Sequence, residues 1–233
     1  MTKEDFIKEL KNIGIIITED ILNKLNRYYE LLCEWNKKIN LTRIVEEKDV
    51  YLKHFYDSLT LYKVADLNNN ISLCDVGTGA GFPGMVLKIV FPNLSVTLVD
   101  SLLKRINFLN VVIKELDLKD IKTVHARCED YAKDHREEFD IVTSRAVANL
   151  TTLSELCIPM VKVNGYFIPM KANAKEEIRE SSDILKKLNC GIESICEFEL
   201  PIENSHRTII KIKKNIKTSV KYPRSFDKIK KNR

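Results

Sequence analysis

The sequence predicts an α/β protein whose doubly wound sheet of seven strands follows an N-terminal helical extension. Three observations carry this prediction. A glycine-rich turn joins a short apolar run to a helix, strand-like and helix-like segments alternate after it, and two long alternating segments end the domain. Alternation of strands and helices is typical of a parallel sheet, whereas two strands joined by a short connection must pair in antiparallel fashion.

Length and composition suggest three parts along the chain. The 233 residues suit one large domain with small additions. We expect a helical extension over residues 1–64, an α/β domain over residues 65–214 and a basic tail over residues 215–233. A hydrophobic content of 44% and a charged content of 30% are ordinary for a folded protein.

The first part is predicted to form two helices. Thr18 can cap the first helix, and apolar residues between Ile21 and Trp35 recur at intervals of three and four residues. A second segment over residues 46–64 repeats this pattern. We expect both helices to pack on the later sheet.

Three side chains on the second helix resemble a catalytic triad in composition. His54, Asp57 and Ser58 are spaced by three and four residues, so they share one helix face. Groups on one face point the same way and cannot converge on one reacting atom, which argues against a hydrolase triad. A structural hydrogen bond is the favoured interpretation, with a place at the mouth of a pocket as the alternative.

The glycine turn is the main functional signal. An apolar run that begins at Ile71 stops at Asp75, and four glycines follow between residues 77 and 84. Glycines in such a turn let the backbone approach a ligand closely, and Pro83 suits the first turn of the helix that follows. The turn therefore predicts a nucleotide-type pocket at the carboxyl end of a parallel strand.

Two cofactors could use this pocket. The G-x-G-x-x-G spacing over residues 79–84 fits a dinucleotide fingerprint and would predict an NAD(P)-dependent oxidoreductase. The D-x-G-x-G-x-G spacing over residues 75–81 fits S-adenosylmethionine (SAM) methyltransferases. The second acid that closes the next strand, Asp100, favours SAM, because an acid there can bind the ribose hydroxyls. We expect Gly77 and Gly79 to pack against the cofactor.

The remaining segments alternate as a doubly wound fold requires. Strands are predicted over residues 94–99, 121–126, 139–144 and 165–170, with helices over 102–116 and 174–188. Strands over 192–200 and 207–213 close the domain as a hairpin. A dinucleotide fold of the usual kind lacks this hairpin, so the hairpin also favours a SAM methyltransferase.

The loops after the third and fourth strands are expected to complete the site. Residues 127–130 follow the third strand, where an amide and an acidic side chain can contact an adenine ring. Residues Ser144–Val147 follow the fourth strand and supply a cation, Arg145, in place of an Asn-Pro-Pro-Tyr or Pro-Cys motif. Guanine N7 is a lone pair without a proton, so its methylation needs neither a base nor a nucleophile. We expect Arg145 to hold the cofactor carboxylate or the pocket, with a surface ion pair as the alternative.

Charge is distributed unevenly. The last 23 residues contain ten Lys or Arg and one Asp, whereas the rest of the chain is net negative. Such a tail suggests an arm for a polyanion, and a solvated terminus without a role is the alternative. We expect the tail to lie beyond the last strand without lining the pocket.

Other classes are not indicated. No apolar run approaches the roughly 20 residues that cross a bilayer, and the start of the chain has no signal-peptide character. The six cysteines are scattered without a Cys-x-x-Cys pair, which predicts free thiols in a reducing cytoplasm and no metal site.

Several motifs together resemble one family over nearly the whole chain. They are Trp35-Asn36…Asn40-Leu41-Thr42, His54…Asp57-Ser58, the glycine turn Asp75–Gly84, Asp100-Ser101-Leu102…Lys104-Arg105 and Ser144-Arg145-Ala146. The sequence resembles the bacterial small-subunit ribosomal RNA methyltransferases that are also called glucose-inhibited division protein B. In this chain Ala172 stands where the family often has glycine, and Tyr222-Pro223-Arg224 runs into a different continuation.

The resemblance carries implications for activity and site. It implies the class I SAM-methyltransferase fold, SAM as the cofactor and N7-methylation of one guanine, position 527 in the 530 loop of 16S RNA, in the cytoplasm. It assigns Gly77, Phe82, Cys128, Glu129 and Arg145 to the cofactor, with Arg145 as the catalytic candidate. The implied partner is 16S RNA in the small ribosomal subunit or an assembly intermediate, bound by a monomer away from any membrane. A module that binds RNA and has a vestigial cofactor pocket remains the other alternative.

Overall fold

The computed structural model describes residues 1–145 and 148–230. Ala146 and Val147, the second half of the expected loop Ser144–Val147, lie outside the described residues. In the described chain, no helix has the length and apolar character that a membrane span requires.

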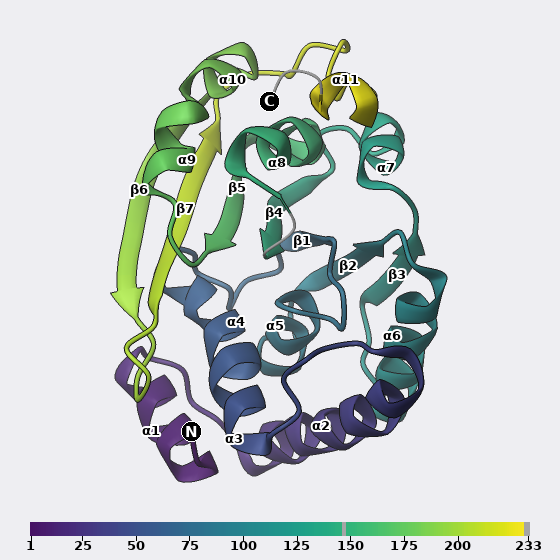
Figure 1. Cartoon of the computed structure of the whole chain (residues 1–233), viewed down its shortest axis with the longest axis vertical. Coiled ribbons are helices and arrows are strands. Elements are labelled where there is room, and N and C mark those ends of the chain that lie inside the picture. The colour runs from purple at the N-terminus through teal and green to yellow at the C-terminus, as the bar shows by residue number, and fades with distance from the viewer. Residues whose placement is uncertain (146–147, 231–233) are drawn as a thin grey trace.

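A seven-stranded sheet forms the centre of the molecule, in the order β3-β2-β1-β4-β5-β7-β6 (Figure 1). The strands are β1 (Ser72–Val76), β2 (Ser95–Asp100), β3 (Ile121–His125), β4 (Phe139–Arg145), β5 (Val161–Lys171), β6 (Cys190–Glu199) and β7 (His206–Lys214). Strands β1 to β5 pair in parallel, and β7 runs antiparallel to both β5 and β6. The predicted fold class is confirmed, including the closing hairpin.

Helices cover both faces of the sheet. The helices are α1 (Lys3–Asn12), α2 (Glu19–Ile39), α3 (Glu47–Val50), α4 (Asp57–Leu59), α5 (Gly84–Val90), α6 (Leu103–Glu115), α7 (Cys128–Asp134), α8 (Leu150–Cys157), α9 (Lys175–Glu180), α10 (Ser182–Lys187) and α11 (Phe226–Lys230). One hydrophobic core joins α1, α2, α5 and α6 to one face, and a second joins α7, α8 and α10 to the other. Because β1 is covered on both faces, four of its five residues are buried, as expected for a central parallel strand.

The N-terminal helices share the first core with the sheet. Thr18 caps α2 by accepting a hydrogen bond from the Ile21 amide, and Leu25, Tyr28, Leu31 and Leu32 form the buried stripe of α2. The ring of Tyr28 stacks near Phe82, and its hydroxyl donates to the Ala80 carbonyl. Helix α2 therefore supports the glycine turn from behind.

Two segments that were predicted as single helices are broken. Residues 46–64 form α3, a π-helical turn Tyr51–Tyr56, α4 and a 3₁₀ turn Thr60–Lys63. Residues 174–188 form α9 and α10, divided at Ser181. At both breaks, hydroxyls donate to helix carbonyls: Ser58 to His54 at 2.6 Å and Ser181 to Ile178 at 2.9 Å. Such bonds compete with the regular helix ladder, which hydrophobic periodicity does not reveal.

The basic tail is folded against the domain over its described length. Arg136 donates to the carbonyls of Thr218 and Tyr222 at 2.7 and 2.6 Å. The guanidinium of Arg224 lies 2.7 Å from the carboxylate of Glu155 on α8, and that carboxylate side chain is only 1% exposed. These contacts hold the tail on the α8 side of the sheet, and its predicted role toward a polyanion stays a prediction.

Candidate active site

A cavity of about 540 Å³ lies at the carboxyl ends of β1, β2, β3 and β4. It is called the glycine-turn cavity below, and its volume is typical of a small-molecule site. Its lining includes every residue that the sequence assigned to the cofactor: Gly77, Gly79, Phe82, Asp100, Cys128, Glu129 and Arg145. The first two strands and their loops provide one wall, and α7, α8 and the part of the helical extension after α2 (Leu41, Thr42 and His54) provide the others.

The glycine turn holds its shape through positive φ angles. Gly77, Gly79 and Gly81 have φ values of 67°, 61° and 104°, which glycine adopts without steric cost. The amides of Gly77 and Gly79 donate to the Val99 carbonyl at 2.8 Å and to Asp100 Oδ2 at 2.9 Å. The turn is thereby fixed to the end of β2.

Two of these glycines are required for different reasons. A Cβ atom on Gly79 would meet only the Gly77 carbonyl oxygen, at 4.0 Å, so this side of the turn is open to a ligand. A Cβ atom on Gly81 would lie 2.5 Å from the Tyr28 hydroxyl and 2.9 Å from Leu109 Cδ2. Gly79 therefore leaves room at the cavity, whereas Gly81 leaves room for α2 and α6.

Asp75 organises the turn from inside the protein. Its Oδ2 accepts hydrogen bonds from the Thr78 hydroxyl at 2.7 Å and from the Gly84 amide at 2.8 Å. Burial raises the pKa of this carboxyl to about 6, although both hydrogen bonds favour the charged form. The sequence placed this acid near the amino-acid end of the cofactor; the structure encloses it behind the turn.

Asp100 lines the cavity and already binds three donors. Its Oδ2 accepts from the Gly79 amide and from Arg105 Nη1, at 2.9 and 3.1 Å, and its Oδ1 accepts from the Leu102 amide at 2.9 Å. A carboxylate offers about four acceptor positions, so about one remains for a ligand hydroxyl while Arg105 stays bound. The residues present fit a ribose at this place, and two hydroxyls would compete with Arg105.

The start of α7 forms the wall next to β3. Cys128 and Glu129 both line the cavity, and Arg127 Nη1 donates to Glu129 Oε1 at 3.2 Å. Leu153 and Leu156 of α8 add apolar surface to the same cavity. An apolar wall beside a carboxylate fits a flat heterocycle that carries an amino group.

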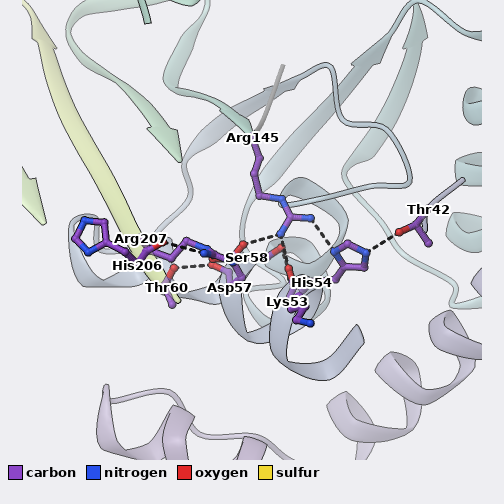
Figure 2. Close-up of polar contacts among 9 residues, drawn as sticks. All are labelled: Thr42, Lys53, His54, Asp57, Ser58, Thr60, Arg145, His206 and Arg207. Atoms are coloured by element: carbon purple, nitrogen blue, oxygen red, sulfur yellow. Dashed lines mark hydrogen bonds and ion pairs between the residues drawn. The ribbon is translucent and has the colours of Figure 1, made fainter. Parts of the chain in front are cut away.

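Arg145 reaches from the end of β4 to the helical extension (Figure 2). Its Nη1 donates to Asp57 Oδ2 and to the Lys53 carbonyl, both at 2.9 Å, and its Nη2 donates to His54 Nδ1 at 3.1 Å. The guanidinium also lies over the Phe82 ring, 5.2 Å from its centre. These contacts fix Arg145 at the cavity wall, so it is not a surface ion pair.

His54 is a neutral imidazole in this arrangement. Its ring stacks on Phe82 with centroids 4.3 Å apart. Because Nδ1 accepts from Arg145, we assign the ring proton to Nε2, which donates to the Thr42 hydroxyl at 3.0 Å. Burial, followed by the charge of Arg145, lowers the pKa of His54 to about 3.

The trio on the second helix does not form a triad. His54 and Asp57 each bind Arg145 through their side chains. Ser58 donates its hydroxyl to the His54 backbone carbonyl, so it is not oriented as a nucleophile. Both sequence alternatives hold in part, because the trio is hydrogen-bonded and His54 lines the cavity.

Three residues at the site were missed by sequence reasoning. Arg207 on β7 donates from Nε to Asp57 Oδ1 at 2.9 Å, Arg105 binds Asp100, and Phe226 of α11 lines the glycine-turn cavity. Phe226 corrects the expectation that the tail does not line the pocket. Arg105 belongs to the motif that begins at Asp100, but nothing in the sequence pattern around Arg207 or Phe226 pointed to the site.

Comparisons with known proteins decide the family. The family model for rRNA small subunit methyltransferase G, GidB, matches residues 21–205. The chain belongs to this family. A ribosomal RNA small subunit methyltransferase G of Oceanobacillus iheyensis is 49% identical over 227 residues, covering 96% of this chain and 95% of that protein. The protein of the same name from Bacillus cytotoxicus is 50% identical over 227 residues, with the same coverage of 96% and 95%.

Solved structures of lower identity share the fold of this family member. A SAM-dependent methyltransferase from Aquifex aeolicus has a TM-score of 0.52 at 18% identity, covering 72% of this chain and 93% of that one. A precorrin-6y C5,15-methyltransferase from Geobacter metallireducens has a TM-score of 0.52 at 14% identity, covering 68% and 87%. The fold is therefore that of class I SAM-dependent methyltransferases.

No metal site accompanies the cavity among the residues that the structure describes, where His, Cys, Asp and Glu form no cluster of three or more suited to an ion. The six cysteines are free thiols, three of them buried and three partly buried. Burial raises the pKa of Cys74 and Cys157 well above the usual range, as expected for structural thiols.

Proposed function

We propose that this protein transfers a methyl group from SAM to N7 of a guanine in the RNA of the small ribosomal subunit. In full, the proposal names guanine 527 in the 530 loop of 16S RNA as the acceptor, the cytoplasm as the location and a monomer as the working form. The main support for the proposal is the glycine-turn cavity, where the seven residues expected for the cofactor lie together. The chain that forms this cavity belongs to the methyltransferase family named above.

The chain offers a matching partner for each part of SAM. Gly77 lines the cavity, Gly79 leaves space along the turn, Asp100 can accept from a ribose hydroxyl, and Glu129 can accept from an exocyclic amine. When bound, SAM supplies an electrophilic methyl group on a sulfonium centre. The protein's task is then to hold the acceptor in line with the methyl–sulfur bond and to exclude water.

The groups at the cavity wall suit an acceptor without a proton. His54 has a pKa of about 3 and already accepts a hydrogen bond from Arg145, so it is a poor base at neutral pH. Asp57 is bound by both Arg145 and Arg207. Guanine N7 needs no deprotonation, so a wall in which His54 and Asp57 are already hydrogen-bonded to arginines suits it. Arg145 acts here as a fixed part of the wall.

The alternatives make different predictions. An NAD(P)-dependent oxidoreductase is not favoured, because the antiparallel β7 and the family both point to SAM. An RNA-binding module with a vestigial pocket would bind RNA without transferring a methyl group.

One experiment tests the proposal and the RNA-binding alternative. The protein is incubated with labelled SAM and small-subunit RNA that lacks the modification, both as free RNA and as assembled particles, and the modified base is mapped. We expect one labelled guanine, methylated at N7. Transfer to another position would overturn the acceptor assignment, and SAM binding without transfer would support the vestigial module.

A further inference from the structure

A second cavity, of about 590 Å³, lies beside the glycine-turn cavity. The two cavities have His54 and Arg145 in common, so they adjoin at these side chains. A methyl acceptor must approach the methyl carbon of SAM from the side opposite the sulfur, because the new bond forms in line with the methyl–sulfur bond that breaks. A cavity that adjoins the proposed cofactor site is where such an acceptor can enter.

The second cavity has the lining of a nucleotide site. Four cations face it, Lys53, Arg145, Lys171 and Arg207, against the two acids Asp57 and Glu177. An excess of positive charge favours a phosphodiester ligand. Apolar surface from Met170, Phe198 and Ile209 lies in the same cavity, and a side chain such as Phe198 offers a ring on which a base can stack.

Ion pairs hold these cations in place. Asp57, whose side chain is 7% exposed, accepts from Arg145 at one oxygen and from Arg207 at the other, and Figure 2 shows it between the two guanidinium groups. Lys171 Nζ lies 2.8 Å from Glu177 Oε2. The cations are therefore preorganised, which reduces the entropy lost when a ligand binds.

We propose that the second cavity binds the acceptor nucleotide of the RNA, with Arg207 and Lys171 as its cationic contacts and Phe198 as its stacking surface. This proposal rests on the proposed function and adds the place of the acceptor. The base is taken out of its stack and enters from the β5–β7 side, so that its N7 lies beside His54 and Arg145, where the two cavities adjoin. Extrusion of the target base from its stack is a general strategy of enzymes that modify bases within RNA or DNA.

Two variants and two controls test the site. Ala172→Trp fills the cavity from an exposed position, and Arg207→Ala removes a cation. Ala172→Gly is the control at the first position. Lys211→Ala is the control for the second, because Lys211 is on the same strand, pairs with Glu193 and is 19% exposed, against 20% for Arg207. Calorimetry with SAM and single-turnover transfer to unmodified small-subunit RNA are measured for all four and for the parent.

We expect Ala172→Trp and Arg207→Ala to lower the transfer rate at subsaturating RNA by about tenfold or more, with SAM affinity within about twofold of the parent. Both controls should keep the parent rate. Parent-like rates in both variants, an equal loss in Lys211→Ala, or a loss of SAM affinity that matches the loss of rate would each overturn this proposal while leaving the proposed function standing. A parent that transfers no methyl group overturns the proposed function itself.

Discussion

At the scale of single residues, neighbouring glycines of the turn are needed for different structural reasons. Gly79 opens onto the glycine-turn cavity, whereas Gly81 faces the Tyr28 hydroxyl and the Leu109 side chain. Both have positive φ angles, so the backbone conformation alone does not distinguish them. What distinguishes them is the space in front of each Cα atom.

Alanine at each position is expected to separate binding from stability. Gly79→Ala should weaken SAM binding by about tenfold while costing about 1–2 kcal/mol of stability, because the added methyl group points to the ligand side. Gly81→Ala should lower the free energy of unfolding by about 3 kcal/mol, because its Cβ overlaps packed side chains. Calorimetry with SAM and urea denaturation measure the two effects. Equal losses of stability in both variants would contradict the distinction.

The titration of Asp75 should make the stability of the protein depend on pH. Its pKa is raised from 3.8 to about 6 by burial, so its contribution to stability is fully present below pH 3.8 and is lost as the pH rises to about 6. Asp75→Asn cannot titrate there. The stability of this variant relative to the parent should therefore grow by about 1.4 kcal/mol per pH unit between pH 4 and pH 6 and level off above.

Urea denaturation of the parent and of Asp75→Asn at pH 4, 5, 6 and 7 measures this difference. Taking the difference removes contributions common to both proteins, including that of His54, which titrates in the opposite sense because its folded pKa is lowered. A difference that stays constant across the series would show that Asp75 keeps an ordinary pKa.

At the scale of elements, α11 and the segment before it connect the chain terminus to the cofactor site. Arg224 binds the buried carboxylate of Glu155 on α8 through its backbone amide and its guanidinium, at 2.7–2.9 Å. Two residues later, Phe226 lines the glycine-turn cavity. The ion pair therefore places part of the tail beside the ligand.

Arg224→Ala is expected to destabilise the fold by about 3 kcal/mol, because it leaves the carboxylate of Glu155 buried without its cation. SAM affinity should fall as well, since Phe226 loses its anchor. Lys133→Ala is the control, because its ion pair with Asp130 is exposed on both sides and should contribute less than about 1 kcal/mol. Urea denaturation and calorimetry give the two readouts, and parent-like values for Arg224→Ala would show that the tail packs independently of this pair.

At the scale of the whole molecule, the basic residues from Lys211 onward fall into two groups that differ in solvent exposure. Arg224 in the tail, like Lys211 and Lys214 in β7, is partly or fully buried and forms an ion pair with an acid of the domain. Lys217 lies 3.9 Å from Glu137, but its side chain is 83% exposed. Lys217, Lys221 and Lys228 have exposed side chains. Only cations that solvent can reach are able to release counterions from RNA, so the second group should determine the salt dependence of RNA binding.

Replacing Lys217, Lys221 and Lys228 together by Gln should reduce the slope of log affinity against log salt by about two to three units, because each phosphate contact contributes about 0.7–0.9. Folding should be unaffected. Replacing Lys8, Lys119 and Lys186, three exposed lysines outside the tail, is the charge-matched control. Fluorescence titrations against one RNA across a salt series measure the slopes. A slope equal to that of the parent would reduce the tail to a structural segment.

The sequence by itself determined the order of the strands and predicted the residues that line the glycine-turn cavity. Both are local properties: the apolar run that ends at Asp75, the glycines that follow it and the acid that ends β2 are read from neighbouring residues. Topology rules then place the ends of β1 and β2 side by side, because parallel strands in a doubly wound sheet share one carboxyl edge. This reasoning brought all the expected cofactor residues to one cavity.

The tertiary structure alone decided which distant groups meet. Asp57 binds Arg145 from 88 residues away and Arg207 from 150 residues away, contacts that depend on the place of β7 in the sheet and that leave no periodic trace in the sequence. The net charge of a segment, counted from the sequence, likewise does not show which of its cations solvent can reach. Lys214 and Lys217 are three residues apart and chemically identical, and both lie near Glu137, at 3.4 and 3.9 Å. Their side chains are nevertheless 1% and 83% exposed, because the first is enclosed in the core and the second extends into solvent.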